Sequence, residues 1–93
     1  RMMAGSDTFR AMTAMVMEAA ADLCEGRLML THEGGYSEAH VPFCGHAVLE
    51  TLAGSDIRAP DPLKDRIDGQ QPGPRFEAYC ATLLAEMEAA LDH

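Results

Sequence analysis

The sequence predicts an α/β protein with a parallel sheet, and three observations support this fold class. Residues 28–30, Leu-Met-Leu, form a continuously apolar run, a pair of glycines follows at positions 34 and 35, and helical patterns lie on both sides. An apolar run without alternation is typical of a strand that is covered on both faces, as in a parallel sheet with helices on either side. We therefore expect residues 27–31 to form a strand that ends in a tight turn.

The first helix is expected over residues 8–24. Ser6 or Asp7 can cap its start, because either side chain accepts a hydrogen bond from the free amides of the first turn. Gly26 is expected to end it. The apolar residues recur at steps of three and four and so form one face of the helix. These residues are Phe9, Met12, Val16, Ala20 and Leu23.

A second helix is expected over residues 42–53. Pro42 suits its first position, where no amide hydrogen is required, and Gly54 closes it. Its buried face is expected to consist of Phe43, Cys44, Val48, Leu49 and Leu52.

The remainder of the chain divides into an irregular connection over residues 55–73 and a last helix from residue 74 to about Leu91. Prolines, glycines and charged residues scattered through the connection indicate a surface segment with one helical turn near residues 63–67. The apolar side of the last helix consists of Phe76, Tyr79, Cys80, Leu83, Met87 and Leu91. We therefore expect one domain with three parts: a helix-strand-turn-helix unit over residues 1–54, the connection over residues 55–73 and the last helix over residues 74–93.

The 93 residues form one domain at most, and they offer little material for a core. There are no tryptophans, two tyrosines and three phenylalanines, so an independent core would need help from a partner or from further sequence. The single predicted strand also leaves both of its edges unpaired. Since the chain opens with Arg1 rather than methionine, we expect it to be part of a longer polypeptide that holds the other strands.

The charge balance and the cysteines limit the partners and the compartment. Seven basic and 15 acidic side chains give a net charge of −8, which argues against binding to a nucleic-acid backbone. Cys24, Cys44 and Cys80 are an odd number at wide spacings, so we expect free cysteines in a small core and a cytoplasmic, reducing location. No run approaches the ~20 apolar residues of a membrane span, so no membrane partner is expected.

The turn Glu33-Gly34-Gly35-Tyr36 is the best candidate for a functional site. Glycines tolerate positive φ and have no Cβ, so Gly34 and Gly35 could bring backbone close to a ligand and turn Tyr36 into a cleft. A tyrosine hydroxyl keeps its proton at neutral pH and can donate a hydrogen bond to an oxygen that gains negative charge in a transition state. The alternative is an ordinary glycine turn with a half-buried tyrosine, and the local sequence alone favours it.

Other reactive side chains do not form a recognisable constellation. His32, His40 and His46 lack the paired spacing of structural zinc sites, so no metal is expected within the chain. Ser37 lacks a nucleophile elbow, and Cys44 sits inside an expected helix with nothing that marks it as activated. Surface histidines and a core cysteine are the simpler interpretations.

One long block of the sequence resembles a known family. It runs from Gly26-Arg27-Leu28 through His32-Glu33-Gly34-Gly35-Tyr36-Ser37-Glu38 to Val41-Pro42-Phe43-Cys44-Gly45. This block is similar to the last conserved block of the bacterial class II histone deacetylase-like amidohydrolases, relatives of the acetylpolyamine amidohydrolases. Arg1-Met2-Met3 and Phe9-Arg10-Ala11-Met12-Thr13 also resemble that family. The likeness covers about residues 1–65 well and the tail more loosely.

The resemblance implies an arginase/deacetylase-type α/β fold, of which this chain is the carboxyl-terminal portion. It also implies that the whole protein hydrolyses an acetyl-lysine or acetylpolyamine-type amide with the help of zinc. Within the family's motif, Tyr36 matches the tyrosine that helps zinc polarise the amide carbonyl and stabilises the oxyanion. Gly34 and Gly35 match the glycines that shape the wall of the substrate channel.

The family's zinc ligands and paired histidines lie in upstream motifs that this chain does not contain. None of His32, His40, His46 or His93 takes over those roles. We therefore expect the chain to hold one catalytic residue, to bind no zinc itself and to be inactive alone. Its expected partners are the upstream part of the same domain and an acetylated amine substrate, and a homo-oligomer is left open. The alternative is a small acidic helical module that dimerises through Met- and Leu-rich faces without catalysis.

Overall fold

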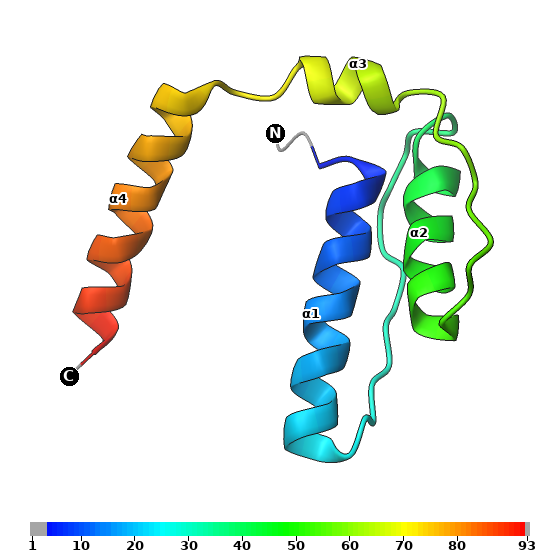
Figure 1. The fold of residues 1–93 in the computed structure, drawn as a ribbon, viewed down its shortest axis with the longest axis horizontal. Coiled ribbons are helices and arrows are strands. Elements are labelled where there is room, and N and C mark those ends of the chain that lie inside the picture. The colour runs from blue at the N-terminus through cyan, green and yellow to red at the C-terminus, as the bar shows by residue number, and fades with distance from the viewer. Residues whose placement is uncertain (1–3, 93) are drawn as a thin grey trace.

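The computed structural model describes residues 4–92, and this part of the chain is built from four helices. They are α1 (Ser6–Cys24), α2 (Val41–Ala53), α3 (Lys64–Gly69) and α4 (Pro74–Leu91). Figure 1 shows α1 and α2 side by side, with the segment that joins them running back along both helices. It also shows α4 at the far end of the connection that contains α3.

The predicted α/β fold with a parallel sheet is wrong for the described chain. Residues 27–36 lie beside α1 and α2 as neither helix nor strand (Figure 1), and within residues 4–92 no backbone N–H of residues 28–36 donates to a backbone carbonyl. A strand exists through hydrogen bonds to a neighbouring strand, and the described residues provide no such neighbour. The apolar run is also not covered on both faces, since Met29 is 84% exposed.

The predicted helices are confirmed close to their expected bounds. α1 begins two residues earlier than expected, because its N-cap is Gly5 rather than Ser6 or Asp7. It ends in a left-handed turn, where the amide of Gly26 donates over 2.9 Å to a carbonyl of the last helical turn. α2 closes at Gly54 in the left-handed conformation, as expected. α3 provides the expected helical turn in the connection, and α4 has the predicted bounds.

The core of the described chain lies between α1 and α2 and consists of small side chains. Ala20 from α1, with Cys44 and Ala47 from α2, are its buried apolar residues. Small side chains let two helices approach closely, but they remove little apolar surface from water. α4 adds nothing to this core, because every residue of that helix is exposed except the half-buried Cys80.

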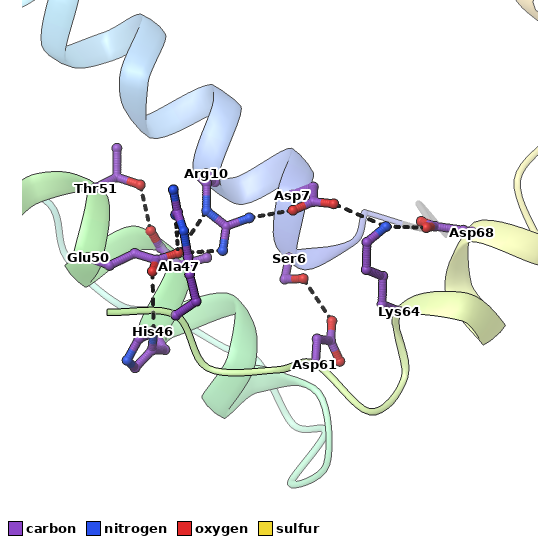
Figure 2. A network of polar contacts seen from close by, with 11 residues as sticks. Ser6, Asp7, Arg10, His46, Ala47, Glu50, Thr51, Asp61, Lys64 and Asp68 are labelled. Atoms are coloured by element: carbon purple, nitrogen blue, oxygen red, sulfur yellow. Dashed lines mark hydrogen bonds and ion pairs between the residues drawn. The ribbon is translucent and has the colours of Figure 1, made fainter. Parts of the chain in front are cut away.

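A buried carboxylate joins α1, α2 and the connection that follows them. The side chain of Glu50 is 1% exposed, and its Oε1 accepts a hydrogen bond from Arg10 Nε over 2.7 Å (Figure 2). Arg58 Nη1 lies 2.9 Å from the same oxygen. Glu50 Oε2 has no hydrogen-bond partner within residues 4–92, and His46 Nδ1 is 3.9 Å away. Glu50, Arg10 and Arg58 are called the Glu50 cluster below.

The two arginines keep Glu50 charged in spite of its burial. Burial raises the pKa of the Glu50 carboxyl, but the hydrogen bonds from Arg10 and Arg58 outweigh this effect, and the pKa lies below its ordinary value of 4.5. Opposite charges from three separate segments therefore hold the connection onto the α1–α2 pair.

The connection is also bound to the first turn of α1. Ser6 Oγ donates to Asp61 Oδ2 over 2.8 Å, and Lys64 Nζ lies 3.2 Å from Asp7 Oδ2 and 2.6 Å from Asp68 Oδ2 (Figure 2). The two residues that were expected to cap α1 bind the connection instead. The helix starts at Ser6 itself, and its N-cap is Gly5, without a side-chain cap.

Two sets of residues named in the sequence analysis, Arg1-Met2-Met3 and His93, lie outside the described part of the chain. Within residues 4–92, none of the helices has the length and apolar character that crossing a bilayer requires. Cys24, Cys44 and Cys80 are free, as expected, but only Cys44 lies in the core, since Cys24 and Cys80 are half-buried.

Candidate functional site

The glycine pair of the candidate turn adopts the backbone conformation that only glycine accepts readily. The φ angles are +64° at Gly34 and +75° at Gly35. A Cβ added to Gly35 would lie 3.0 Å from both His32 Nε2 and Val41 Cγ2. Gly35 is thus enclosed between the preceding segment and the first residue of α2, whereas a Cβ on Gly34 would only touch the Tyr36 ring, at 4.0 Å. Both glycines therefore adopt the positive φ that the sequence analysis described as open to them.

Tyr36 follows the glycine pair and points its side chain into solvent. The residue is 96% exposed, and its hydroxyl has no hydrogen-bond partner within residues 4–92. The structure therefore brings Gly34, Gly35 and Tyr36 together in one turn, but it does not enclose the phenol in a cleft. A half-buried tyrosine, the simpler alternative at this position, is not what the structure contains.

The backbone after Tyr36 leads directly into α2. The carbonyl of Ser37 accepts hydrogen bonds from the amides of His40 over 3.2 Å and Val41 over 3.0 Å, and Ser37 Oγ accepts a second one from the His40 amide over 3.2 Å. The His40 ring is held as well, since its Nε2 lies 3.1 Å from the Ala4 carbonyl oxygen. The turn is therefore anchored to the start of both α1 and α2.

An open apolar groove of about 640 Å³ lies beside this turn. It is formed by α1, α2 and the segment that joins them. The apolar faces predicted for the first two helices meet here, but several of their residues remain exposed, such as Met12 at 45% and Leu49 at 66%. The lining residues are Phe9, Met12, Thr13, Val16, Leu30, Thr31, His32, Glu33, Gly35, Val41, Cys44, Gly45, Val48, Leu49 and Leu52.

The other reactive side chains do not assemble into a site. Within residues 4–92, no three His, Cys, Asp or Glu side chains lie close enough to hold a metal ion. Cys44 Sγ lies 3.2 Å from His40 Nε2, but burial, and then the charge of Asp61, raise the pKa of the thiol. Cys44 is therefore a protonated thiol at the groove floor rather than an activated nucleophile.

Sequence reasoning missed Glu50 and Ser37. Glu50 was not assigned to any face of the second helix, although its step of three from Ala47 places it on the buried side. Ser37 was considered only as a nucleophile, whereas its hydroxyl bonds the amide three residues on, a local role that serine often has in turns. The spacing of three residues, from Ala47 to Glu50 and from Ser37 to His40, is what relates each residue to its neighbour.

Comparison with known proteins supports the resemblance drawn from the residues. No protein-family model matches the chain. The chain is nevertheless homologous to a histone deacetylase-like amidohydrolase over nearly its whole length. This relative is the histone deacetylase-like amidohydrolase of Pseudomonas aeruginosa, which is 53% identical over 89 residues. The match covers 96% of the chain and 23% of the relative, so the chain spans less than a quarter of that protein's length.

Proposed function

We propose that this chain is the carboxyl-terminal segment of a zinc-dependent deacetylase, to which it contributes the oxyanion-stabilising residue Tyr36. The proposed reaction is hydrolysis of an acetyl-lysine or acetylpolyamine-type amide. The observation that carries the proposal is the turn itself. Two glycines at positive φ place an almost fully exposed tyrosine at the edge of a groove, within a stretch homologous to an amidohydrolase.

The chemistry assigned to this chain is the donation of one hydrogen bond. The Tyr36 hydroxyl is free to bind a ligand, because no residue within 4–92 forms a hydrogen bond with it. The hydroxyl would donate a hydrogen bond to the amide oxygen of the substrate as that oxygen gains negative charge. Such a hydrogen bond is typically worth about 2.7 to 4 kcal/mol of transition-state stabilisation. Gly34 and Gly35 would let the substrate pass close to the backbone, since neither carries a side chain.

Zinc would have to be held by residues outside this chain. The described residues offer no group of three ligands, so we assign no step of the reaction to a metal bound here. In the whole enzyme the metal would polarise the same oxygen that Tyr36 stabilises. We therefore propose that the isolated chain is inactive.

The proposed partner is the upstream part of the same deacetylase domain. Two features support this: the groove is lined by apolar residues, and the core between α1 and α2 contains only small side chains. Exposed apolar surface of this extent is unusual for a protein that folds and acts alone. The other proposed partner is an acetylated amine substrate, and the charge of −8 gives no reason to propose nucleic acid.

A chimera tests the proposal directly. This chain would replace the matching segment of the Pseudomonas aeruginosa relative, and turnover of an acetyl-lysine reporter would be measured with zinc content. Tyr36→Phe should lower kcat by about 10²- to 10³-fold while zinc content is unchanged. Tyr79→Phe, at the chain's other tyrosine, should have no effect, because Tyr79 lies on α4 away from the turn. Normal turnover by Tyr36→Phe would remove Tyr36 from the mechanism.

The same assay applied to the 93-residue chain alone tests the second half of the proposal. We expect no stoichiometric zinc and no turnover. Zinc-dependent hydrolysis by the isolated chain would show that its own residues form a complete site.

One observation favours the alternative function, a non-catalytic helical interaction module. The apolar side of α4 is exposed, with Phe76 at 53% and Leu83 at 42%, and could pack against a second copy of the chain. Sedimentation at increasing concentration separates the two functions. A stable dimer, together with a chimera that lacks activity, would favour the module.

A further inference from the structure

The backbone on both sides of Tyr36 is fixed by the start of α2, whereas the Tyr36 side chain is free. On the amino-terminal side, Gly35 lies between His32 and Val41, the first residue of α2, since an added Cβ would be 3.0 Å from each. On the carboxyl-terminal side, the Ser37 carbonyl accepts the hydrogen bonds of the His40 and Val41 amides. The direction in which the tyrosine leaves the backbone is therefore set by α2, together with the segment that encloses Gly35 from the other side.

Ser37 adds a side-chain hydrogen bond to this arrangement. Its Oγ accepts from the His40 amide over 3.2 Å, in addition to the bond from the same amide to the Ser37 carbonyl. The bond closes a ring that runs forward from Ser37 to His40, so it restrains rotation about the Cα–C bond of Ser37. That rotation sets the direction of the Ser37 N–Cα bond, and Tyr36 is attached to this nitrogen.

The residue that anchors Ser37 is itself held in place. His40 Nε2 lies 3.1 Å from the Ala4 carbonyl oxygen and 3.2 Å from Cys44 Sγ, so the ring connects the start of α1 to the first turn of α2. The Ser37 hydroxyl therefore bonds to a fixed point of the α1–α2 pair, and not to a flexible loop.

We propose that Ser37 is a positioning residue for Tyr36, which it holds in the orientation needed to reach the substrate oxygen. This inference rests on the proposed role of Tyr36. The phenol oxygen lies at the end of a long side chain, so a small rotation about the Cα–C bond of Ser37 displaces it by more than the backbone moves. A misplacement of about 1 Å at a reacting group can cost roughly 10²-fold in rate. The hydroxyl of Ser37 limits that rotation.

The test compares three variants of the chimera described above. Ser37→Ala removes the hydroxyl, Ser37→Thr keeps one, and Ser55→Ala is the matched control. Ser55 makes an equivalent exposed bond, accepting from the Ile57 amide over 3.1 Å, but lies in the connection after α2. We expect Ser37→Ala to lower kcat about tenfold with little change in KM, since the carbonyl bonds of the turn remain. Ser37→Thr should restore kcat, and Ser55→Ala should leave it unchanged.

The outcomes separate this inference from the proposed function. Loss of activity in Tyr36→Phe with normal kcat in Ser37→Ala would overturn the positioning role and leave the role of Tyr36 intact. Normal activity in Tyr36→Phe would overturn both. A loss in Ser37→Ala that Ser37→Thr does not restore would show that the hydroxyl is not the cause, and the inference would fail.

Amide exchange in the 93-residue chain keeps the inference testable if the Ser37→Ala chimera does not assemble. The His40 amide should exchange faster in Ser37→Ala and at the original rate in Ser37→Thr, because one of its two acceptors is lost and regained. Unchanged exchange in Ser37→Ala would mean that the hydroxyl does not restrain the turn.

Discussion

The Glu50 cluster and the Tyr36 turn are built in opposite ways. The cluster gathers Arg10, Glu50 and Arg58 from separate segments around a carboxylate that is 1% exposed. The turn consists of consecutive residues and presents a tyrosine that is 96% exposed. Buried, paired charges hold the helices and the connection together, whereas the Tyr36 hydroxyl has no partner within residues 4–92. The stability of this chain and its proposed chemistry therefore reside in different regions.

Disturbing the contact between α1 and α2 should have the largest effect on stability. Ala47 is 1% exposed, so Ala47→Leu forces extra carbon atoms into a tightly filled place. Overpacking of this kind costs about 1 to 3 kcal/mol of the free energy of unfolding. Urea denaturation followed by circular dichroism would measure it. Ala81→Leu on the exposed α4 is the control, and equal midpoints for the two variants would contradict the placement of the core.

A substitution in the turn should cost less, because the turn contributes little to the core. Gly35→Ala places a side chain at φ +75°, a conformation that costs about 1 to 2 kcal/mol, and its Cβ would crowd Val41. Gly69→Ala is the matched control, since a Cβ there meets nothing within 4 Å and the residue has no positive φ. We expect urea denaturation to show a loss of stability for the first variant alone. The same midpoint for both would mean that the turn does not need glycine at position 35.

The difference between the two regions also explains what the sequence could predict. The Tyr36 turn depends on neighbours in the chain, so Gly34-Gly35 was enough to predict a turn with positive φ, but not the exposed position of Tyr36. The helices were predictable for the same reason, because spacing at three and four residues is a local signal. The Glu50 cluster could not be predicted in this way, because Arg10 lies 40 positions before Glu50 and no local pattern indicates that the two residues form a pair.

The failure of the sheet prediction has a related cause. The apolar run Leu28-Met29-Leu30 indicates that a segment can be covered on both faces, but not what covers it. Pairing requires a second segment at the right distance, and within residues 4–92 there is none. Composition was the better guide, since the shortage of large rings agrees with a core of small side chains.

The smallest expected effect is a dependence of stability on pH that arises from the Glu50 cluster. The pKa of Glu50 is below its ordinary value of 4.5, because the hydrogen bonds from Arg10 and Arg58 outweigh the opposite effect of burial. A lowered pKa means that the folded chain binds fewer protons than the unfolded chain as the solution becomes acidic. Glu50 therefore contributes stability above about pH 4.5 that is lost as the pH falls through the folded-state value. The contribution is modest, because burial cancels part of it.

Thermal unfolding between pH 7 and pH 3 would measure this dependence, with Glu50→Gln expected to show a shallower decline in Tm below pH 4.5. Asp7 is the matched second site, because Lys64 in particular lowers the pKa of its exposed carboxyl below 3.8. Asp7→Asn should reduce the decline in Tm only at the more acidic end of the range. Its effect should be smaller than that of Glu50→Gln, since exposed ion pairs contribute little. If Glu50→Gln followed the parent curve throughout, the arginines would not be what stabilises the charged carboxylate.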